Sequence, residues 1–289
     1  MNSDLIAVTG ATGALGGRVA GRLADAGVAQ RLVVRDPSRA PRLAGAEVVV
    51  ATGYDDSASM RAALDGVHTV FLVSATETAN RVGAHTSAVD AAVAAGVQRI
   101  VYVSFVGASP QATFTFARDH WHTEDHVRSS GVDHTVLRNN LYLDVLPSFP
   151  GPDGVLRGPA GAGRFGGVAR DDIADAAAAV LTTDGHGGMT YDLTGPETIT
   201  MDEVAAELTR ASGRLISYDA ETLDQAYASR AGFGAPDWEV AGWVTSYAAI
   251  AVGELDVVST HVEKLTGHLP MSFAEFLARN PAEVRRLQR

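Results

Sequence analysis

Short runs of apolar residues, many of them β-branched, alternate with longer amphipathic segments through the first half of the chain. The runs are apolar at nearly every position, which is typical of strands in a sheet that is covered on both faces. Several amphipathic segments end in glycine, the residue preferred directly after a helix. The predicted strands are 5–9, 31–35, 46–50, 68–74, 99–104 and 133–138, and the predicted helices are 13–27, 57–66, 81–96 and 120–131. This alternation predicts an α/β fold of right-handed βαβ units with a doubly wound parallel sheet.

The pattern changes after residue 146. Residues 147–167 are rich in proline and glycine, which predicts an irregular loop. Amphipathic segments of helical length then dominate, with strand-like pieces at MTYDLT and RLISYD between them. The predicted helices are 170–182, 200–213, 221–232, 238–253 and 271–280. We therefore expect an α/β domain, residues 1–146, and a smaller, mainly helical domain, residues 147–289, some of whose strands return to the core sheet.

Charge and composition exclude several classes of protein. The chain of 289 residues has a net charge of −11, and its 23 lysine and arginine residues are scattered, so nucleic acid and anionic membranes are not expected partners. The absence of cysteine excludes disulfides, thiolate nucleophiles and cysteine-based metal sites. The N-terminal residues MNSDLIAVTG lack the pattern of a signal peptide, and no apolar run approaches about 18 residues, so a cytoplasmic location is expected. An oligomer is possible, and its state stays open.

A glycine-rich turn follows the first predicted strand directly. In TGATGALGG, residues 9–17, Gly10, Gly13 and Gly16 are spaced three apart, and the first predicted helix begins inside the motif. Glycines there permit a tight turn and let backbone N–H groups at a helix N-terminus approach a pyrophosphate. A glycine triplet also occurs in ordinary strand-to-helix turns, but its place at the head of a βαβ series favours a dinucleotide site. No GK[ST] sequence follows, so the turn is not a Walker loop.

The end of the second strand predicts which dinucleotide binds. Arg35 stands where an acidic residue would hydrogen-bond the ribose 2′-hydroxyl of NAD, and an arginine there suits a 2′-phosphate. NADP(H) is therefore expected, and NAD(H) is less favoured. Asp36 is the counter-evidence, because it would serve NAD if the position shifted by one residue, although it also suits the start of the DPSR turn. After the third strand, Asp55 is either an adenine-side contact or the N-cap of the next helix.

These residues resemble the atypical branch of the short-chain dehydrogenase/reductase superfamily, which includes NmrA-like proteins, NADPH:quinone oxidoreductases and triphenylmethane reductase. The resemblance covers nearly the whole chain and is closest to the quinone oxidoreductase and triphenylmethane reductase group. It is carried, in order, by VTGATGALGG, VVRDPSRA, YDD, VFLVSATE, AVDAAVAAGVQRIVYVSF, HTEDHVRSSGVDHTVLRNNLY, ARDDIADAAAAVL and YDLTGPETITMDEVAAEL. It implies a Rossmann-type NAD(P)-binding domain followed by a smaller C-terminal domain.

The resemblance also implies positions for the cofactor and the substrate. NADPH would be held along the turn, at Gly10, Thr12, Gly13, Ala14, Leu15 and Gly16, with Arg35 on its 2′-phosphate. The nicotinamide would lie near the ends of the fourth and fifth strands, at Ser74, Ala75, Ser104 and Phe105. Residues 138–142, which include Asn139 and Tyr142, would border the nicotinamide and the substrate pocket. This agrees with the general rule that ligands of doubly wound sheets bind outside the carboxyl ends of the strands.

The catalytic pair of ordinary superfamily members is missing. Those members carry Tyr-x-x-x-Lys after strand five, with the lysine four residues before a glutamate; relative to Glu124, this chain has Phe116 and His120 at the two places. No tyrosine precedes Lys264, the only lysine, by four residues. The lack of a general acid disfavours simple ketone reduction, whereas a quinone or similar conjugated acceptor gives a delocalised anion of low basicity.

The expected activity is therefore direct hydride transfer from NADPH to a quinone or a similar flat, aromatic small molecule. The candidate catalytic residues are His120 in place of the lysine, Tyr142 as an acid, and Ser104 near the superfamily's serine. Each of them also has an ordinary structural explanation. Two other functions stay open: a non-catalytic NmrA-like regulator that senses NADP(H), and an isomerase or dehydratase that makes an aromatic product.

Three histidines within seven residues raise the question of a metal site. His122 and His126 are four residues apart, as two zinc ligands on one helical face would be. However, there is no HExxH motif, and a third ligand would have to come from elsewhere in the chain. No metal is expected, and His122 and His126 are interpreted as ordinary helix residues.

Overall fold

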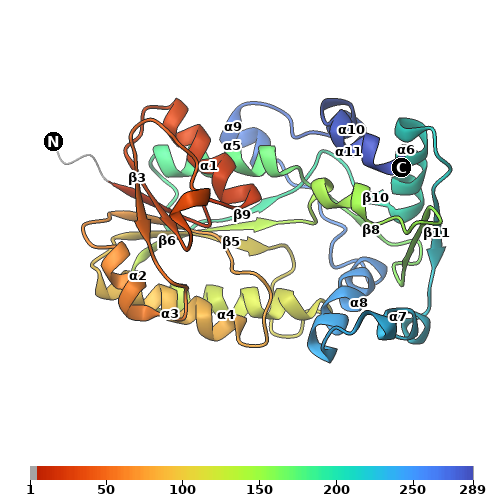
Figure 1. Cartoon of the computed structure of the whole chain (residues 1–289), viewed down its shortest axis with the longest axis horizontal. Coiled ribbons are helices and arrows are strands. Elements are labelled where there is room, and N and C mark those ends of the chain that lie inside the picture. The colour runs from red at the N-terminus through yellow and green to blue at the C-terminus, as the bar shows by residue number, and fades with distance from the viewer. Residues whose placement is uncertain (1–4, 289) are drawn as a thin grey trace. The chain divides into compact units, whose positions relative to one another are not determined.

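The apolar runs of the first half pair side by side in one sheet (Figure 1). The computed structural model describes residues 5–288, and within them the sheet has the strand order β3-β2-β1-β4-β5-β6-β9. Its strands are β1 (Ile6–Thr9), β2 (Gln30–Val34), β3 (Ala46–Val50), β4 (Thr69–Leu72), β5 (Arg99–Phe105), β6 (Asp133–Asn139) and β9 (Thr190–Leu193). β1 pairs in parallel with β2 and β4, and the pairs β2·β3 and β4·β5 are also parallel. The predicted Rossmann-type α/β fold is confirmed.

Helices cover both faces of this sheet. α2 (Ser57–Ala63), α3 (Arg81–Ala94) and α4 (Thr115–Ser129) lie on one face, and α1 (Ala14–Asp25) and α5 (Arg170–Thr182) lie on the other (Figure 1). The two helices of the second face are joined by ion pairs from Arg22 of α1, which lies 2.8 Å from Asp171 and 2.9 Å from Asp175 of α5. α1 is amphipathic: its apolar residues are buried, while Arg22 on its polar side makes these ion pairs with α5.

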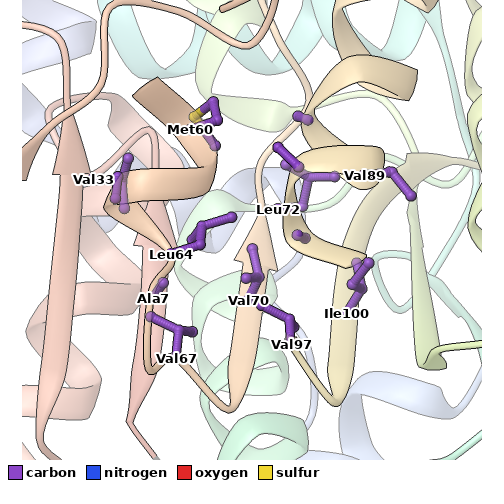
Figure 2. Close-up of a cluster of buried hydrophobic side chains, with 14 of the residues drawn as sticks. Ala7, Val33, Met60, Leu64, Val67, Val70, Leu72, Val89, Val97 and Ile100 are labelled. Atoms are coloured by element: carbon purple, nitrogen blue, oxygen red, sulfur yellow. The ribbon is translucent and has the colours of Figure 1, made fainter. Parts of the chain in front are cut away.

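Apolar side chains between the sheet and α2 and α3 form a core cluster (Figure 2). Val33, Val70 and Ile100 come from three strands of the sheet, and Met60 and Val89 come from the two helices. All five side chains are buried. Since complete burial of such a side chain stabilises the fold by about 1.5–3 kcal/mol, this cluster fixes the strands whose carboxyl ends carry the candidate site.

The contacts of the chain group it into two compact units. The first unit contains the chain up to Phe105, together with Asp119–Arg138 and Arg170–Tyr191. The second unit contains Val106–Arg118, Asn139–Ala169 and the chain from Asp192 onward. The predicted domain boundary after residue 146 stays a prediction.

Helices dominate the second unit, as the sequence predicts for the C-terminal region. They are α6 (Met201–Ser212), α7 (Leu223–Arg230), α8 (Asp237–Ala251), α9 (His261–Thr266), α10 (Phe273–Arg279) and α11 (Pro281–Leu287). Two short strand pairs accompany them, β7 (Val155–Gly158) with β11 (Ser217–Ala220) and β8 (Arg164–Phe165) with β10 (Ile199–Thr200). Short 3-10 turns lie along the chain at Pro37–Arg39, Leu143–Ser148 and Ala231–Phe233. None of the helices within residues 5–288 has both the length and the hydropathy needed to span a membrane.

Candidate functional site

The glycine-rich turn joins β1 to α1 with no room for a side chain at Gly16. Gly10 has a φ of +62°, a conformation that favours glycine, and its carbonyl oxygen accepts a hydrogen bond from Gly13 N–H at 2.8 Å. A Cβ atom on Gly16 would lie 2.4 Å from the Gly10 carbonyl oxygen. The first turn of α1 carries no acidic residue, so the positive end of the helix dipole faces the turn uncompensated. The turn therefore has the form of a phosphate-binding cradle.

A pocket of about 420 Å³ in the first unit opens beside this turn. It is bounded by the residues that follow β1, β2, β3 and β4, which is where a parallel sheet presents its ligand site. Ten residues expected to bind the cofactor line it: Gly10, Thr12, Gly13, Ala14, Leu15, Gly16, Arg35, Asp55, Ser74 and Ala75. The structure therefore brings together residues that lie 65 positions apart in the sequence.

The pocket also includes Tyr54, which the sequence analysis did not identify. Its hydroxyl lies 2.5 Å from Thr9 Oγ1 and 2.6 Å from the carbonyl oxygen of Val73, so it ties the loop after β3 to the ends of β1 and β4. Burial raises the pKa of Tyr54, which keeps the hydroxyl protonated as a donor. The sequence feature that could have identified Tyr54 as a pocket residue is its position directly before Asp55, in YDD.

Arg35 lines the pocket, while the neighbouring Asp36 is used in a turn. The Asp36 carboxylate accepts hydrogen bonds from Ser38 Oγ at 2.6 Å and from Ser38 N–H at 2.9 Å. These two bonds lower the pKa of Asp36 and hold the carboxylate in place. Of the two interpretations of Asp36, the turn is the one that the geometry supports.

Asp55 and Asp56 have separate roles at the start of α2. The N-cap of this helix is Asp56, whose carboxylate accepts hydrogen bonds from Ser59 N–H at 3.0 Å and Thr52 Oγ1 at 2.6 Å. The interpretation of Asp55 as the N-cap is therefore wrong by one residue. Asp55 lines the pocket instead, which leaves its predicted adenine-side contact available.

The peptide group of Ala75, just beyond β4, is held from both sides by α3. Its N–H donates to Nε2 of His85 at 2.8 Å, and its carbonyl oxygen accepts from Nε of Arg81 at 2.9 Å. The Arg81 side chain is 4% exposed, and its guanidinium also lies 3.8 Å from Glu77 and 3.9 Å from Asp119. Burial and the nearby Arg81 lower the pKa of His85 to about 3, so the ring is neutral. This wall of the pocket is therefore fixed by a buried histidine and a buried arginine.

Two further predicted residues, Ser104 and His120, lie at the end of β5 and in α4. Ser104 Oγ donates to Glu124 Oε1 at 2.6 Å, so its proton is already committed to a carboxylate. His120 Nδ1 lies 2.9 Å from the hydroxyl of Tyr102, and its ring stacks on Phe105 with 6.3 Å between centroids. Burial, followed by Arg81 and His85, lowers the pKa of His120 well below its usual value. His120 is therefore an uncharged imidazole.

The remaining predicted residues belong to the second unit. There Asn139 Nδ2 donates to the hydroxyl of Tyr142 at 3.4 Å, and Asn139 Oδ1 is a buried acceptor without a partner among residues 5–288. Phe116 packs on Trp238 of α8, with 6.1 Å between ring centroids. The proximity of Asn139 and Tyr142 to the nicotinamide stays a prediction.

The other two histidines of α4 have ordinary partners. His126 Nε2 lies 2.7 Å from a carboxylate oxygen of Asp90, and the His122 ring packs edge-on against Trp121 at 5.0 Å. His122 is exposed to solvent. The four-residue spacing of the two rings is thus explained by helix-surface contacts.

A family model described as NAD(P)H-binding matches residues 10–184, which is more than half of the chain. The chain belongs to this family. The matched residues include Gly10–Gly16 of the glycine-rich turn, Arg35, Asp55 and the Ala75 wall of the pocket. Family membership therefore agrees with a nicotinamide dinucleotide as the ligand of the pocket.

Relatives of this NAD(P)H-binding protein include reductases. Quinone oxidoreductase 2 of Escherichia coli (strain K12) is 35% identical over 277 residues, which cover 94% of this chain and 96% of the relative. The solved structure of an NADPH-dependent quinone oxidoreductase from Escherichia coli in complex with NADPH superimposes with a TM-score of 0.86 at 34% identity. The matched region covers 95% of this chain and 99% of the chain in that structure. Citrobacter sp. triphenylmethane reductase complexed with NADP(H) has a TM-score of 0.83 at 31% identity, with 95% and 99% covered.

These comparisons confirm the resemblance to the atypical, NmrA-like short-chain dehydrogenase/reductase group. They also show that the protein is an NAD(P)H-dependent oxidoreductase similar to quinone reductases.

Proposed function

We propose that this protein uses NADPH to reduce a quinone or a similar conjugated acceptor. The observation that carries the proposal is the side chain at the position of the superfamily's lysine. His120 is buried and its pKa lies well below the usual value, so a neutral imidazole replaces a cationic ammonium group there. Phe116, at the position of the tyrosine, has no proton to donate. These two replacements favour an acceptor that does not need a strong acid.

A quinone meets this requirement. Addition of a hydride to a quinone gives a hydroquinone monoanion whose charge is spread over the ring. A proton from water then completes the hydroquinone. NADPH supplies the hydride, and the protein supplies binding, orientation and exclusion of solvent. The relatives named for quinone and triphenylmethane reduction support an acceptor of this flat, conjugated class.

Each part of the cofactor has residues suited to it in this proposal. The Gly10–Gly16 turn and the N-terminus of α1 bind the pyrophosphate, because both present backbone N–H groups without side-chain obstruction. Arg35 binds the 2′-phosphate, and Asp55 lies on the adenine side. Ser74 and Ala75 lie beside the nicotinamide.

The acceptor class is tested by following oxidation of NADPH spectrophotometrically. We expect the purified protein to consume NADPH in the presence of benzoquinones or naphthoquinones and to leave it unchanged with an unconjugated aliphatic ketone. A protein that binds NADPH but consumes none with any quinone would reject this proposal and favour the NmrA-like regulatory function.

The cofactor preference is tested by replacing Arg35 with aspartate. Loss of a charge-assisted contact to the 2′-phosphate is expected to remove about 2 kcal/mol, which corresponds to a fall of about 30-fold in the NADPH-to-NADH ratio of kcat/KM. Arg39→Asp, an equal charge change at the exposed end of the Pro37–Arg39 turn, is the matched control and should leave the ratio nearly unchanged. An unaltered ratio in the Arg35 variant would show that the 2′-phosphate is bound elsewhere.

A further inference from the structure

A line of buried polar side chains extends from the end of β4 toward His120. It runs from the peptide of Ala75 to His85 of α3 and then to Thr123 of α4, and a separate hydrogen bond joins Tyr102 of β5 to His120. His85, Thr123 and Tyr102 are completely buried, and His120 is 6% exposed. All five residues belong to the first unit. Because β4 and β5 are neighbouring parallel strands, both ends of the line lie at the same edge of the sheet.

The direction of the hydrogen bonds is fixed at the Ala75 end. A backbone N–H can only donate, so Nε2 of His85 must be an acceptor. The pKa of His85, lowered to about 3 by burial and Arg81, means that the ring carries one proton, which must therefore be on Nδ1. That proton is donated to Thr123 Oγ1, 2.9 Å away. The tautomer of His85 is thus determined by a main-chain group.

The direction at the far end follows from the Tyr102 hydroxyl. Burial raises the pKa of Tyr102, so its oxygen keeps a proton that needs an acceptor in the protein interior. Within residues 5–288 the hydrogen-bond partner of this hydroxyl is Nδ1 of His120 at 2.9 Å, because Thr123 Oγ1 donates its own proton to the carbonyl oxygen of Asp119. A neutral imidazole nitrogen is also a better acceptor than a phenol oxygen. Tyr102 therefore donates to Nδ1, and His120 carries its own proton on Nε2.

Nε2 of His120 is free to meet a ligand. Within the part of the chain that the structure describes, this nitrogen has no hydrogen-bond partner. It is not buried, and it therefore forms part of the small solvent-exposed area of the ring. The hydrogen bond to Tyr102 orients the ring, and Phe105 stacks beside it. The ring therefore presents one N–H group in a fixed direction.

The geometry points to a directed hydrogen-bond relay in two segments: Ala75 donates to His85, which donates to Thr123, and Tyr102 donates to His120. The second segment holds His120 as a neutral donor with its proton on Nε2. This N–H donates to an oxygen atom of the bound cofactor or acceptor, at the position where the superfamily's lysine would act. Tyr102 is the positioning residue for His120 in this arrangement, whereas His85 and Thr123 hold the peptide of Ala75. The role of the donor rests on the proposed function, whereas the tautomer itself does not.

The tautomers are measured by long-range ¹H–¹⁵N NMR correlation on the whole protein with ¹⁵N-labelled histidine. Spectra of the His85→Gln and His120→Gln variants assign the two rings. We expect His85 protonated on Nδ1 and His120 protonated on Nε2, both unchanged between about pH 6 and pH 8, where an ordinary histidine titrates. A His120 ring protonated on Nδ1, or one that becomes cationic in this range, would overturn the relay whatever the enzyme does with quinones.

Variants of the relay test its effect on catalysis. Tyr102→Phe keeps the shape of the core but removes the donor, so the His120 signals should shift to mixed tautomers and kcat with a quinone should fall about tenfold. Thr123→Val, which removes the acceptor of the His85 proton, should shift the His85 signals, and Thr123→Ser, which keeps the hydroxyl, should retain them. His122→Gln, on the exposed surface of α4, is the control and should change neither signals nor kcat.

The kinetic constants distinguish the two sources of the acceptor oxygen. A rise in the dissociation constant of NADPH in His120→Leu places the oxygen on the cofactor, and a loss confined to kcat or to the KM of the quinone places it on the acceptor. His120→Gln, which retains an amide donor, should keep more activity than His120→Leu. Equal activity of wild type, His120→Leu and Tyr102→Phe would refute the catalytic role even if the tautomers are as expected.

Discussion

A Gly16→Ala variant is expected to lose both stability and NADPH affinity. The added Cβ atom would lie 2.4 Å from the carbonyl oxygen of Gly10 and 2.9 Å from that of Thr9, and neither backbone atom can move without displacing the turn. Overpacking of this kind costs about 3 kcal/mol in the free energy of unfolding. Because the same turn presents the N–H groups to the pyrophosphate, NADPH affinity should fall more than about tenfold.

Gly21→Ala is the matched control for this prediction, because it makes the same substitution in the same helix. Apart from the backbone of α1 itself and the two chain neighbours, no described heavy atom lies within 4 Å of the Cβ position at Gly21, and the residue is in the interior of α1. Alanine should therefore stabilise the helix by up to about 1 kcal/mol through its higher helix propensity and leave cofactor binding unchanged. Denaturant unfolding and fluorescence titration with NADPH measure the two effects. Similar behaviour of the two variants would contradict the role assigned to Gly16.

The second large effect is expected for Glu124→Gln. The Glu124 side chain is completely buried and accepts hydrogen bonds from Ser104 at 2.6 Å, from Arg138 at 2.7 and 2.8 Å, and from Arg128 at 2.7 Å. Removing its charge leaves the Arg138 guanidinium facing an amide, and breaking a buried ion pair in this way costs about 3 kcal/mol of unfolding free energy. Arg128→Met is the control, because Arg128 is 39% exposed and its ion pair should contribute less than about 1 kcal/mol.

The effect of Glu124 should depend on pH in a defined direction. Burial raises its pKa, but hydrogen bonds from Arg138 and Ser104 outweigh this effect, so the pKa lies below the usual 4.5. A carboxylate with a lowered pKa in the folded state stabilises above its unfolded pKa, and this stabilisation is lost as the pH falls through the folded value. The difference in unfolding free energy between wild type and Glu124→Gln should thus be constant near neutrality and shrink below pH 4.5. A difference that stays constant into acid would show that Glu124 acts by shape and not by charge.

The strands were predictable because their signal is local and redundant. Runs such as RIVYVS are apolar at almost every position, and strands buried on both faces need this composition. The start of α4 was not predictable in the same way. The helix begins at Thr115, five residues before the predicted start, and the residues that hold its first turn come from α8, where Thr245 Oγ1 accepts from Thr115 N–H at 3.2 Å. Such a contact spans 130 positions and has no local signal.

The sequence by itself determined the fold class, the phosphate-binding turn and the candidates Arg35 and Asp55. These depend on a strand, a tight turn and a helix that are contiguous in the chain, so their chemistry can be inferred from spacing. The tertiary structure decided which neighbouring aspartate caps α2, and it revealed the line of polar groups that extends toward His120. His85, Tyr102 and Thr123 resemble ordinary helix and strand residues in the sequence. Only the packing of α3 and α4 on β5 removes water from them, and buried polar groups must then satisfy one another.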